Sequence, residues 1–133
     1  MKEVTERWVR KSDGDFRSMK LLFSTNEEPN YDAVCYHAQQ SVDKLLKAVL
    51  IESNAKFRRT HDLQELLVSI LDIHLELANL ESNLSRLTEL GMEFRYPDEF
   101  ASKFDAERSI EIASEARDLI RQFLGPADDA LFA

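Results

Sequence analysis

Eight polar side chains in three segments have the types and spacing needed to hold an anionic ligand. They are His37, Gln40, Lys44, Lys47, Arg59, His61, Arg95 and Tyr96. Lysine and arginine bind phosphate through charge-assisted hydrogen bonds, and a tyrosine ring can stack on a nucleobase. If the three segments converge in the folded chain, we expect them to form a nucleotide-binding site.

The first four of these residues belong to one helical pattern. At about 100° per residue, His37, Gln40, Lys44 and Lys47 fall within about 80° of one another on the helix surface. They therefore form a polar ridge along the rim of the apolar face of that helix.

The same residues also allow a structural interpretation. Gln40 and both histidines could satisfy buried backbone groups at helix ends and loops. Arg95 could pair with Asp62 or Asp98, and the two lysines could extend along the surface with their charges in water. The sequence leaves both interpretations open.

Metal binding, nucleophilic catalysis and a glycine-rich phosphate loop find little support in the sequence. The three histidines and Cys35 lack the paired spacing of a zinc site, so no metal is expected. The chain has three glycines and no glycine-rich phosphate loop, and no serine or cysteine has a recognisable partner base. We predict no catalytic residue and no cofactor.

Charge and composition restrict the partners. With 17 basic and 25 acidic residues, the net charge is −8, which disfavours RNA as a partner unless a local basic patch exists. A single cysteine fits a reducing compartment, and no segment is apolar enough for a signal peptide or a membrane span. We expect a cytoplasmic protein.

Apolar residues recur at helical spacing through most of the chain, which predicts an all-α fold. The expected helices cover about residues 2–23 and 31–53, a third begins at Thr60 as N-cap, a fourth runs through 77–90 and ends at Gly91, and the last starts near Ser102. Together they predict an antiparallel up-and-down bundle of four to five helices in one domain, residues 1–126, with a flexible tail at 127–133.

The predicted interior takes one to three apolar residues from each expected helix. These residues are Trp8, Phe16, Val34, Ala38, Leu45, Leu66, Leu84, Ile110 and Ile120.

Three short strings connect this pattern to a known family. They are YDAVCYHAQQ at 31–40, followed by Lys44 and Lys47, then RTHDL at 59–63 and FRYP at 94–97. In this order and spacing the chain resembles HEPN domains, small helical proteins often encoded beside minimal nucleotidyltransferases. The resemblance implies a homodimer, a nucleotidyltransferase partner as in toxin–antitoxin modules, and, as proposed for some members, nucleotide binding.

HEPN ribonucleases carry an arginine and a histidine separated by four to six residues. None of the three histidines of this chain follows an arginine at that distance. Three hypotheses follow: a noncatalytic nucleotide- or substrate-binding partner of a nucleotidyltransferase, which we favour, a ribonuclease toxin with a divergent site, or a structural dimeric scaffold.

Overall fold

The computed structural model describes residues 1–25, 27–94 and 96–125, and in these ranges all regular structure is helical. The elements are α1 (Glu3–Ser24), α2 (Tyr31–Glu52), α3 (Leu63–Leu71), the 3-10 helix η1 (Leu75–Leu80), α4 (Glu81–Glu93) and α5 (Lys103–Arg121). This confirms the predicted all-α bundle, and the bounds of α1 and α2 agree with the expected ones within one residue. The predicted flexible tail lies outside the described residues.

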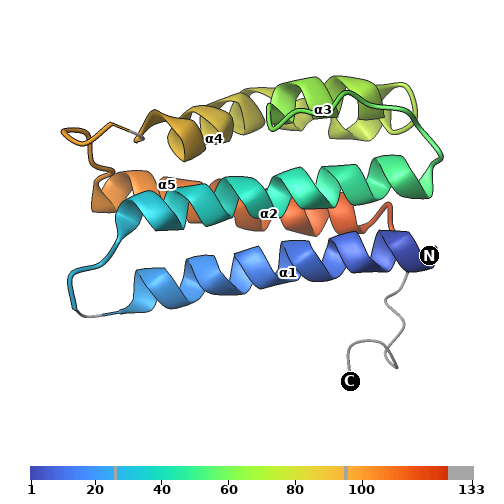
Figure 1. The fold of residues 1–133 in the computed structure, drawn as a ribbon. Helices are drawn as coiled ribbons and strands as arrows, with labels where there is room; N and C mark the ends of the chain where they lie inside the picture. The colour runs from blue at the N-terminus through green and yellow to red at the C-terminus, as the bar shows by residue number, and fades with distance from the viewer. Residues whose placement is uncertain (26, 95, 126–133) are drawn as a thin grey trace.

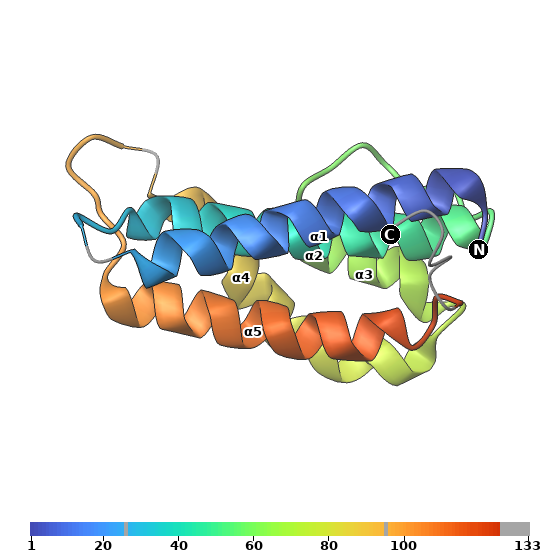
Figure 2. The same ribbon diagram turned by 90° about the horizontal axis from the view of Figure 1, so that it is seen from below.

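Helix α2 is the central element of the bundle. It packs against α1, α3, α4 and α5, and Figure 1 shows it between α1 on one side and the layer of α3 and α4 on the other. The view from below shows α5 running alongside α1 and α2 (Figure 2). Residues of α2 are consequently buried on several sides, polar ones included.

The core contains most of the residues predicted for it. Val34, Ala38, Leu45, Leu66, Leu84 and Ile120 are at most 1% exposed. The predicted full burial is wrong for Trp8, Phe16 and Ile110, which pack against the core but remain partly exposed. Phe16, for example, lies beneath the Lys20 ammonium and the Arg117 guanidinium, 4.8 and 4.7 Å from its ring centroid, so it belongs to the margin of the bundle.

Helix starts follow the expected capping chemistry with one correction. Ser102 caps α5, and its side chain and that of Asp105 form a reciprocal capping box. The N-cap of α3 is Asp62 rather than Thr60, because the Asp62 carboxylate accepts hydrogen bonds from the backbone amides of Gln64 and Glu65. Thr60 instead accepts from the Asp62 amide at 3.0 Å.

Gly91 does not end α4, which continues to Glu93. A Cβ atom at Gly91 would lie 2.6 Å from Cβ and 2.8 Å from Cγ of Gln39, closer than atoms can pack. The glycine is therefore required by the close approach of α4 to α2, and the interpretation of Gly91 as a helix stop was wrong.

Replacing Gly91 with alanine is expected to lower the free energy of unfolding by about 1–3 kcal/mol, because the added methyl group overpacks the contact with Gln39. Denaturant titration measures the change. Gly14→Ala is the matched control, since a Cβ at Gly14 meets nothing within 4 Å. In α1 that substitution is expected to stabilise the protein by about 0.5–1 kcal/mol. Stabilisation of both variants would contradict the steric role of Gly91.

Candidate functional site

Two residues of the predicted ridge meet at one carboxylate of α1. The Asp15 side chain is largely buried, His37 Nδ1 lies 2.8 Å from its Oδ1, and the Lys44 ammonium donates to its Oδ2. His37 and Lys44 are seven residues apart on α2, so both face the same neighbouring helix. Asp15 thereby joins α1 to the ridge.

A second carboxylate, that of Asp43, contacts two further predicted site residues, Lys47 and His61. Asp43 is 1% exposed, its Oδ1 lies 2.7 Å from Lys47 Nζ, and its Oδ2 lies 2.9 Å from His61 Nδ1. Lys47 is four residues after Asp43 on α2, while His61 comes from the connection between α2 and α3. The buried charge of Asp43 is thus compensated within the chain.

The two carboxylates also fix the tautomers of the histidines. An ionised carboxylate only accepts hydrogen bonds, so each Nδ1 carries a proton and donates it to Asp15 or Asp43. In the neutral imidazole, Nε2 is then the acceptor. For His61, whose side chain is 65% exposed, this leaves a nitrogen oriented by a buried acid.

Gln40 takes part through its neighbour. Its Nε2 donates to Gln39 Oε1 at 2.9 Å, and Gln39 Nε2 donates to the His61 carbonyl at 2.6 Å. The side chain that satisfies the backbone of the His61 segment is therefore the buried Gln39, held beneath Gly91, and Gln40 supports it.

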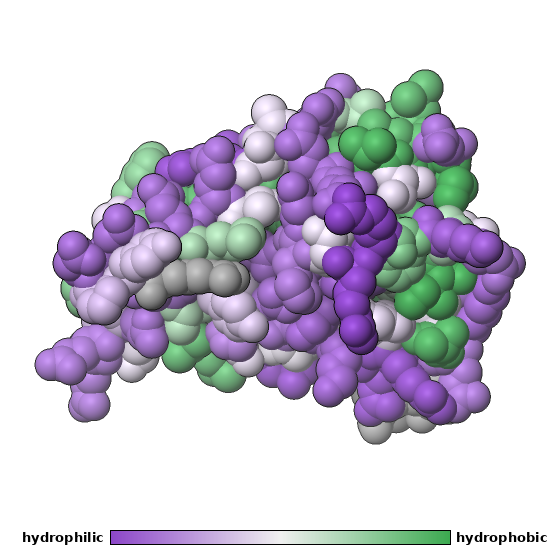
Figure 3. All heavy atoms as spheres, turned by 45° about the horizontal axis from the view of Figure 1, so that its top comes forward, coloured by the Kyte–Doolittle hydropathy of each residue, from purple (hydrophilic) through white to green (hydrophobic). Residues whose placement is uncertain are grey.

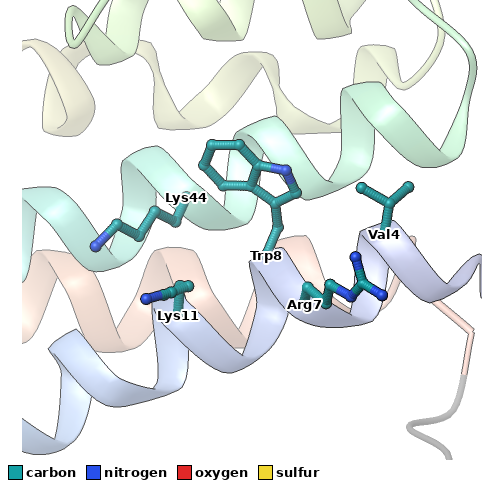
Figure 4. Close-up of a pocket in the computed structure, with 5 residues that line it drawn as sticks. All are labelled: Val4, Arg7, Trp8, Lys11 and Lys44. Atoms are coloured by element: carbon teal, nitrogen blue, oxygen red, sulfur yellow. The ribbon is translucent and has the colours of Figure 1, made fainter.

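A hollow of about 410 Å³ opens between α1 and α2 beside these networks. It is lined by Val4, Arg7, Trp8, Lys11 and Lys44. Figure 4 shows Lys11 and Lys44 extending on one side of the indole and Arg7 and Val4 placed on the other. Lys47 Nζ lies 5.9 Å from the centroid of the same Trp8 ring, but Lys47 is 6% exposed, pairs with Asp43 and does not line the hollow. The hollow thus combines an aromatic surface with several cations.

Cations of the hollow keep internal partners as well. Arg7 pairs with Glu3 at 2.8 Å on the exposed side of α1, and Lys44 pairs with Asp15. An anionic ligand would share these cations with carboxylates, which lowers the gain from each contact.

The remaining predicted residues are not joined to the ridge by any contact found among the described residues. Arg59 is exposed on the connection to α3, and Tyr96 is 70% exposed. The segment after Tyr96 is anchored at the start of α2, where the Ala101 amide donates to Asp32 at 2.6 Å. Twelve residues of helix separate Asp32 from Lys44, about 18 Å along the axis. Arg95 lies outside the described residues, so convergence of all three segments stays a prediction.

Sequence reasoning missed Asp43, Asp15 and Trp8 as members of the site. Asp43 precedes Lys47 by four residues on α2, and such a spacing is itself a signal for a pair. The contribution of α1 was harder to find, because Asp15 and Trp8 meet the ridge only after α1 packs on α2.

Cys35, in the same string as His37, has no part in this chemistry. Burial raises the pKa of its thiol to about 11, so it is not a nucleophile at neutral pH. In the described part of the chain, no group of three or more histidine, cysteine, aspartate or glutamate side chains is placed to hold a metal ion. None of the helices described is long and apolar enough to cross a membrane.

Comparison with known proteins identifies the family. The model of the HEPN domain family matches residues 5–123, nearly the whole chain. The chain belongs to the HEPN domain family. A similar protein is the one named "Putative toxin MJ1304" of Methanocaldococcus jannaschii. The two are 30% identical over 134 aligned positions, which cover 88% of this chain and 86% of the relative.

Two solved structures share the fold of this HEPN protein. One is TT1696 from Thermus thermophilus, with a TM-score of 0.74 and 18% identity over 90% of this chain and 98% of the other. The second is ST0689, described as an archaeal HEPN homologue, with a TM-score of 0.70 and 20% identity over 92% and 99% of the two chains. At these identities the likeness establishes the fold.

Proposed function

We propose that this protein is a noncatalytic, cytoplasmic HEPN protein that binds a nucleotide or similar anionic ligand and partners a minimal nucleotidyltransferase in a toxin–antitoxin-like module. The observation that carries the proposal is the hollow beside Trp8, where cations from two helices flank an indole in a chain of net charge −8. In an acidic protein, several cations around one aromatic ring create a local positive potential, which favours binding of an anion there.

The hollow fits the parts of a nucleotide. Its volume of about 410 Å³ lies within the range of small-molecule sites. A base would stack on the indole, and its phosphates would reach the ammonium groups of Lys11 and Lys44. Of the eight residues predicted from the sequence, Lys44 lines this hollow, and Lys47 lies near the indole while paired with Asp43. His37, Gln40 and His61 belong to the adjoining polar networks. Arg59 and Tyr96 make no contact with these networks among the described residues, and Arg95 lies outside those residues.

Tryptophan fluorescence should report binding directly, because Trp8 is the only tryptophan in the chain. Titration with common mononucleotides is expected to quench the emission to saturation. Lys11→Ala is expected to weaken binding by about 10- to 150-fold, the equivalent of a charge-assisted hydrogen bond of about 1.5–3 kcal/mol. Lys11 is exposed, so the melting temperature should stay near that of the wild type.

Lys103→Ala is the matched control, since Lys103 is an exposed lysine at the start of α5, which does not line the hollow. It should bind as the wild type does. Nucleotides that leave the emission unchanged, or equal weakening in both lysine variants, would contradict the proposed site.

A ribonuclease is the second candidate. The observation in its favour is the exposed His61, whose Nδ1 is held by the buried Asp43 as a catalytic base is held in hydrolases. The relative from Methanocaldococcus jannaschii, which is named a toxin, agrees with such a role. The missing arginine–histidine motif weighs against it, since no arginine precedes His61 at the distance that would hold a scissile phosphate.

We therefore expect no metal-independent ribonuclease activity above a buffer control. The measurement is cleavage of a labelled RNA by the purified protein in the presence of a chelator. Cleavage that the wild type shows and His61→Ala loses would favour the ribonuclease instead. The alanine variant must keep its fold, because His61 also contacts Asp43.

The scaffold hypothesis and the homodimer concern a different surface. The face that carries α3 and α4 is polar over much of its area and apolar toward one end (Figure 3). Exposed apolar side chains in α3 and just after it are Val68, Ile73 and Leu75. Uncovered apolar surface of this kind supports the proposal of a homodimer.

A further inference from the structure

The outer face of α1 is covered by none of the described helices. Among the described elements, α1 packs only against α2 and the edge of α5, and Figure 1 shows it at the margin of the bundle with α3 and α4 on the far side of α2. In the view from below, α1 lies in front of α2 (Figure 2). A complete face of a 22-residue helix thus points away from the fold.

The outer face can be followed along one row of residues. Positions 4, 7, 11, 14, 18 and 21 alternate by three and four residues, so they lie along one side of α1, where a partner helix could pack. Its two ends are apolar, with Val4 44% and Leu21 64% exposed. Between them the row holds two cations and then two small residues, Gly14 and Ser18. We call these six positions the α1 seam.

No contact within the described part of the fold explains Gly14. A glycine inside a helix costs about 1 kcal/mol relative to alanine. Gly91 is required by contact with Gln39, whereas a Cβ at Gly14 would meet nothing within 4 Å, and neither glycine has a positive φ. A shallow hollow of about 270 Å³ lies at Gly14, lined also by Arg10, Asp13 and Arg17. The backbone of α1 is therefore open to close approach from outside.

The flanks of the seam are strongly basic. From Arg7 to Lys20, α1 has five cations and two carboxylates, a net charge of 5 − 2 = +3, in a chain of −8. Asp13 pairs with Arg117 and Arg121 of α5, at 2.6 and 3.5 Å, and Asp15 pairs within the ridge. All five cations are exposed and both carboxylates are at least partly buried, so cations dominate the outward charge of this stretch, with Arg7 at its start paired to the exposed Glu3.

We propose that the α1 seam docks an acidic α-helix of another protein, which crosses α1 at Gly14. Two copies of the seam would bring like charges together, so a symmetric contact of α1 with α1 is disfavoured. A nucleic acid would use the cations, but it would gain nothing from heptad-spaced apolar ends or from an open backbone at the centre. This inference goes beyond the proposed nucleotide site, although the seam shares Val4, Arg7 and Lys11 with the hollow beside Trp8.

The probe is a labelled synthetic helix of about three heptads, with leucines at its ends, alanine at its centre and glutamates along both flanks. Fluorescence anisotropy at low salt should show saturable binding to the wild type. Gly14→Gln should weaken binding about tenfold by filling the crossing point, with an unchanged or higher melting temperature. Arg17→Glu should weaken it by a similar factor through repulsion.

Lys103→Glu is the matched control for Arg17→Glu, because it changes the net charge equally and lies away from the seam. It should leave peptide binding unchanged. The nucleotide site is measured separately, by titrating the Gly14→Gln variant with nucleotide and following Trp8 fluorescence. A failure of the docking proposal can therefore be distinguished from a failure of the nucleotide-binding proposal.

Three results would overturn the inference. The first is no binding of the peptide. The second is equal peptide binding by the wild type and Gly14→Gln, which would reduce the seam to a nonspecific basic surface. The third is a single-stranded RNA that displaces the peptide and binds the wild type and Gly14→Gln equally, which would make the face a nucleic-acid surface.

Discussion

Asp43→Ala is expected to lower the free energy of unfolding by about 3–5 kcal/mol, the usual cost of removing one partner of a buried ion pair. Lys47 is 6% exposed and its ammonium lies between Asp43 and the Trp8 ring. Without the carboxylate, that charge stays buried and unpaired, and His61 loses the group that orients it. Denaturant titration at neutral pH measures the loss.

Two further variants separate the buried charge from other effects. Asp43→Leu with Lys47→Met removes both charges, so it should recover much of the stability that Asp43→Ala loses. Arg86→Ala breaks an exposed pair with Glu89 (3.1 Å) and should cost less than about 1 kcal/mol. Wild-type stability of Asp43→Ala would mean that Lys47 reaches water and the pair is not buried in solution.

Ala38→Arg is expected to destabilise the protein by about 3–5 kcal/mol or to prevent folding. Ala38 is fully buried on α2, so the longer side chain both overpacks the core and strands a charge. Circular dichroism on heating gives the melting temperature. Tyr36→Arg is the control on the same helix, because Tyr36 is 46% exposed and its replacement should change stability by no more than about 0.5 kcal/mol.

An unchanged melting temperature in Ala38→Arg would contradict the burial of this face of α2. Equal losses in Ala38→Arg and Tyr36→Arg would show that arginine is harmful to the helix itself rather than to its packing.

The helices were predictable because their apolar periodicity is local information. α2 was predicted almost to its last residue from the stripe that includes Val34, Ala38 and Leu45. Gly91 was misinterpreted because its role depends on a contact with Gln39, fifty-two residues earlier, and a local rule for helix ends cannot detect such a contact. Trp8 was assigned to the interior by the same periodicity, which does not distinguish the centre of a core from its margin.

The site was predictable only in part, for a related reason. The ridge of α2 follows from helix geometry, and the sequence correctly placed His37 and Lys44 on one side of the helix. Their shared partner Asp15 comes from α1, and the hollow beside Trp8 is formed by residues of α1 together with Lys44 of α2. The sequence showed the cations of α2 and did not show that Asp15, on another helix, already pairs with Lys44.

The buried pair on α2 also restricts how this protein can evolve. A change at Asp43 or Lys47 alone leaves one charge inside the fold, so an intermediate with a single substitution is penalised whichever residue changes first. The two positions can therefore be exchanged only together, or after His61 and Trp8 have altered their surroundings. Because of this constraint, we expect the residues at positions 43 and 47 to covary among homologues.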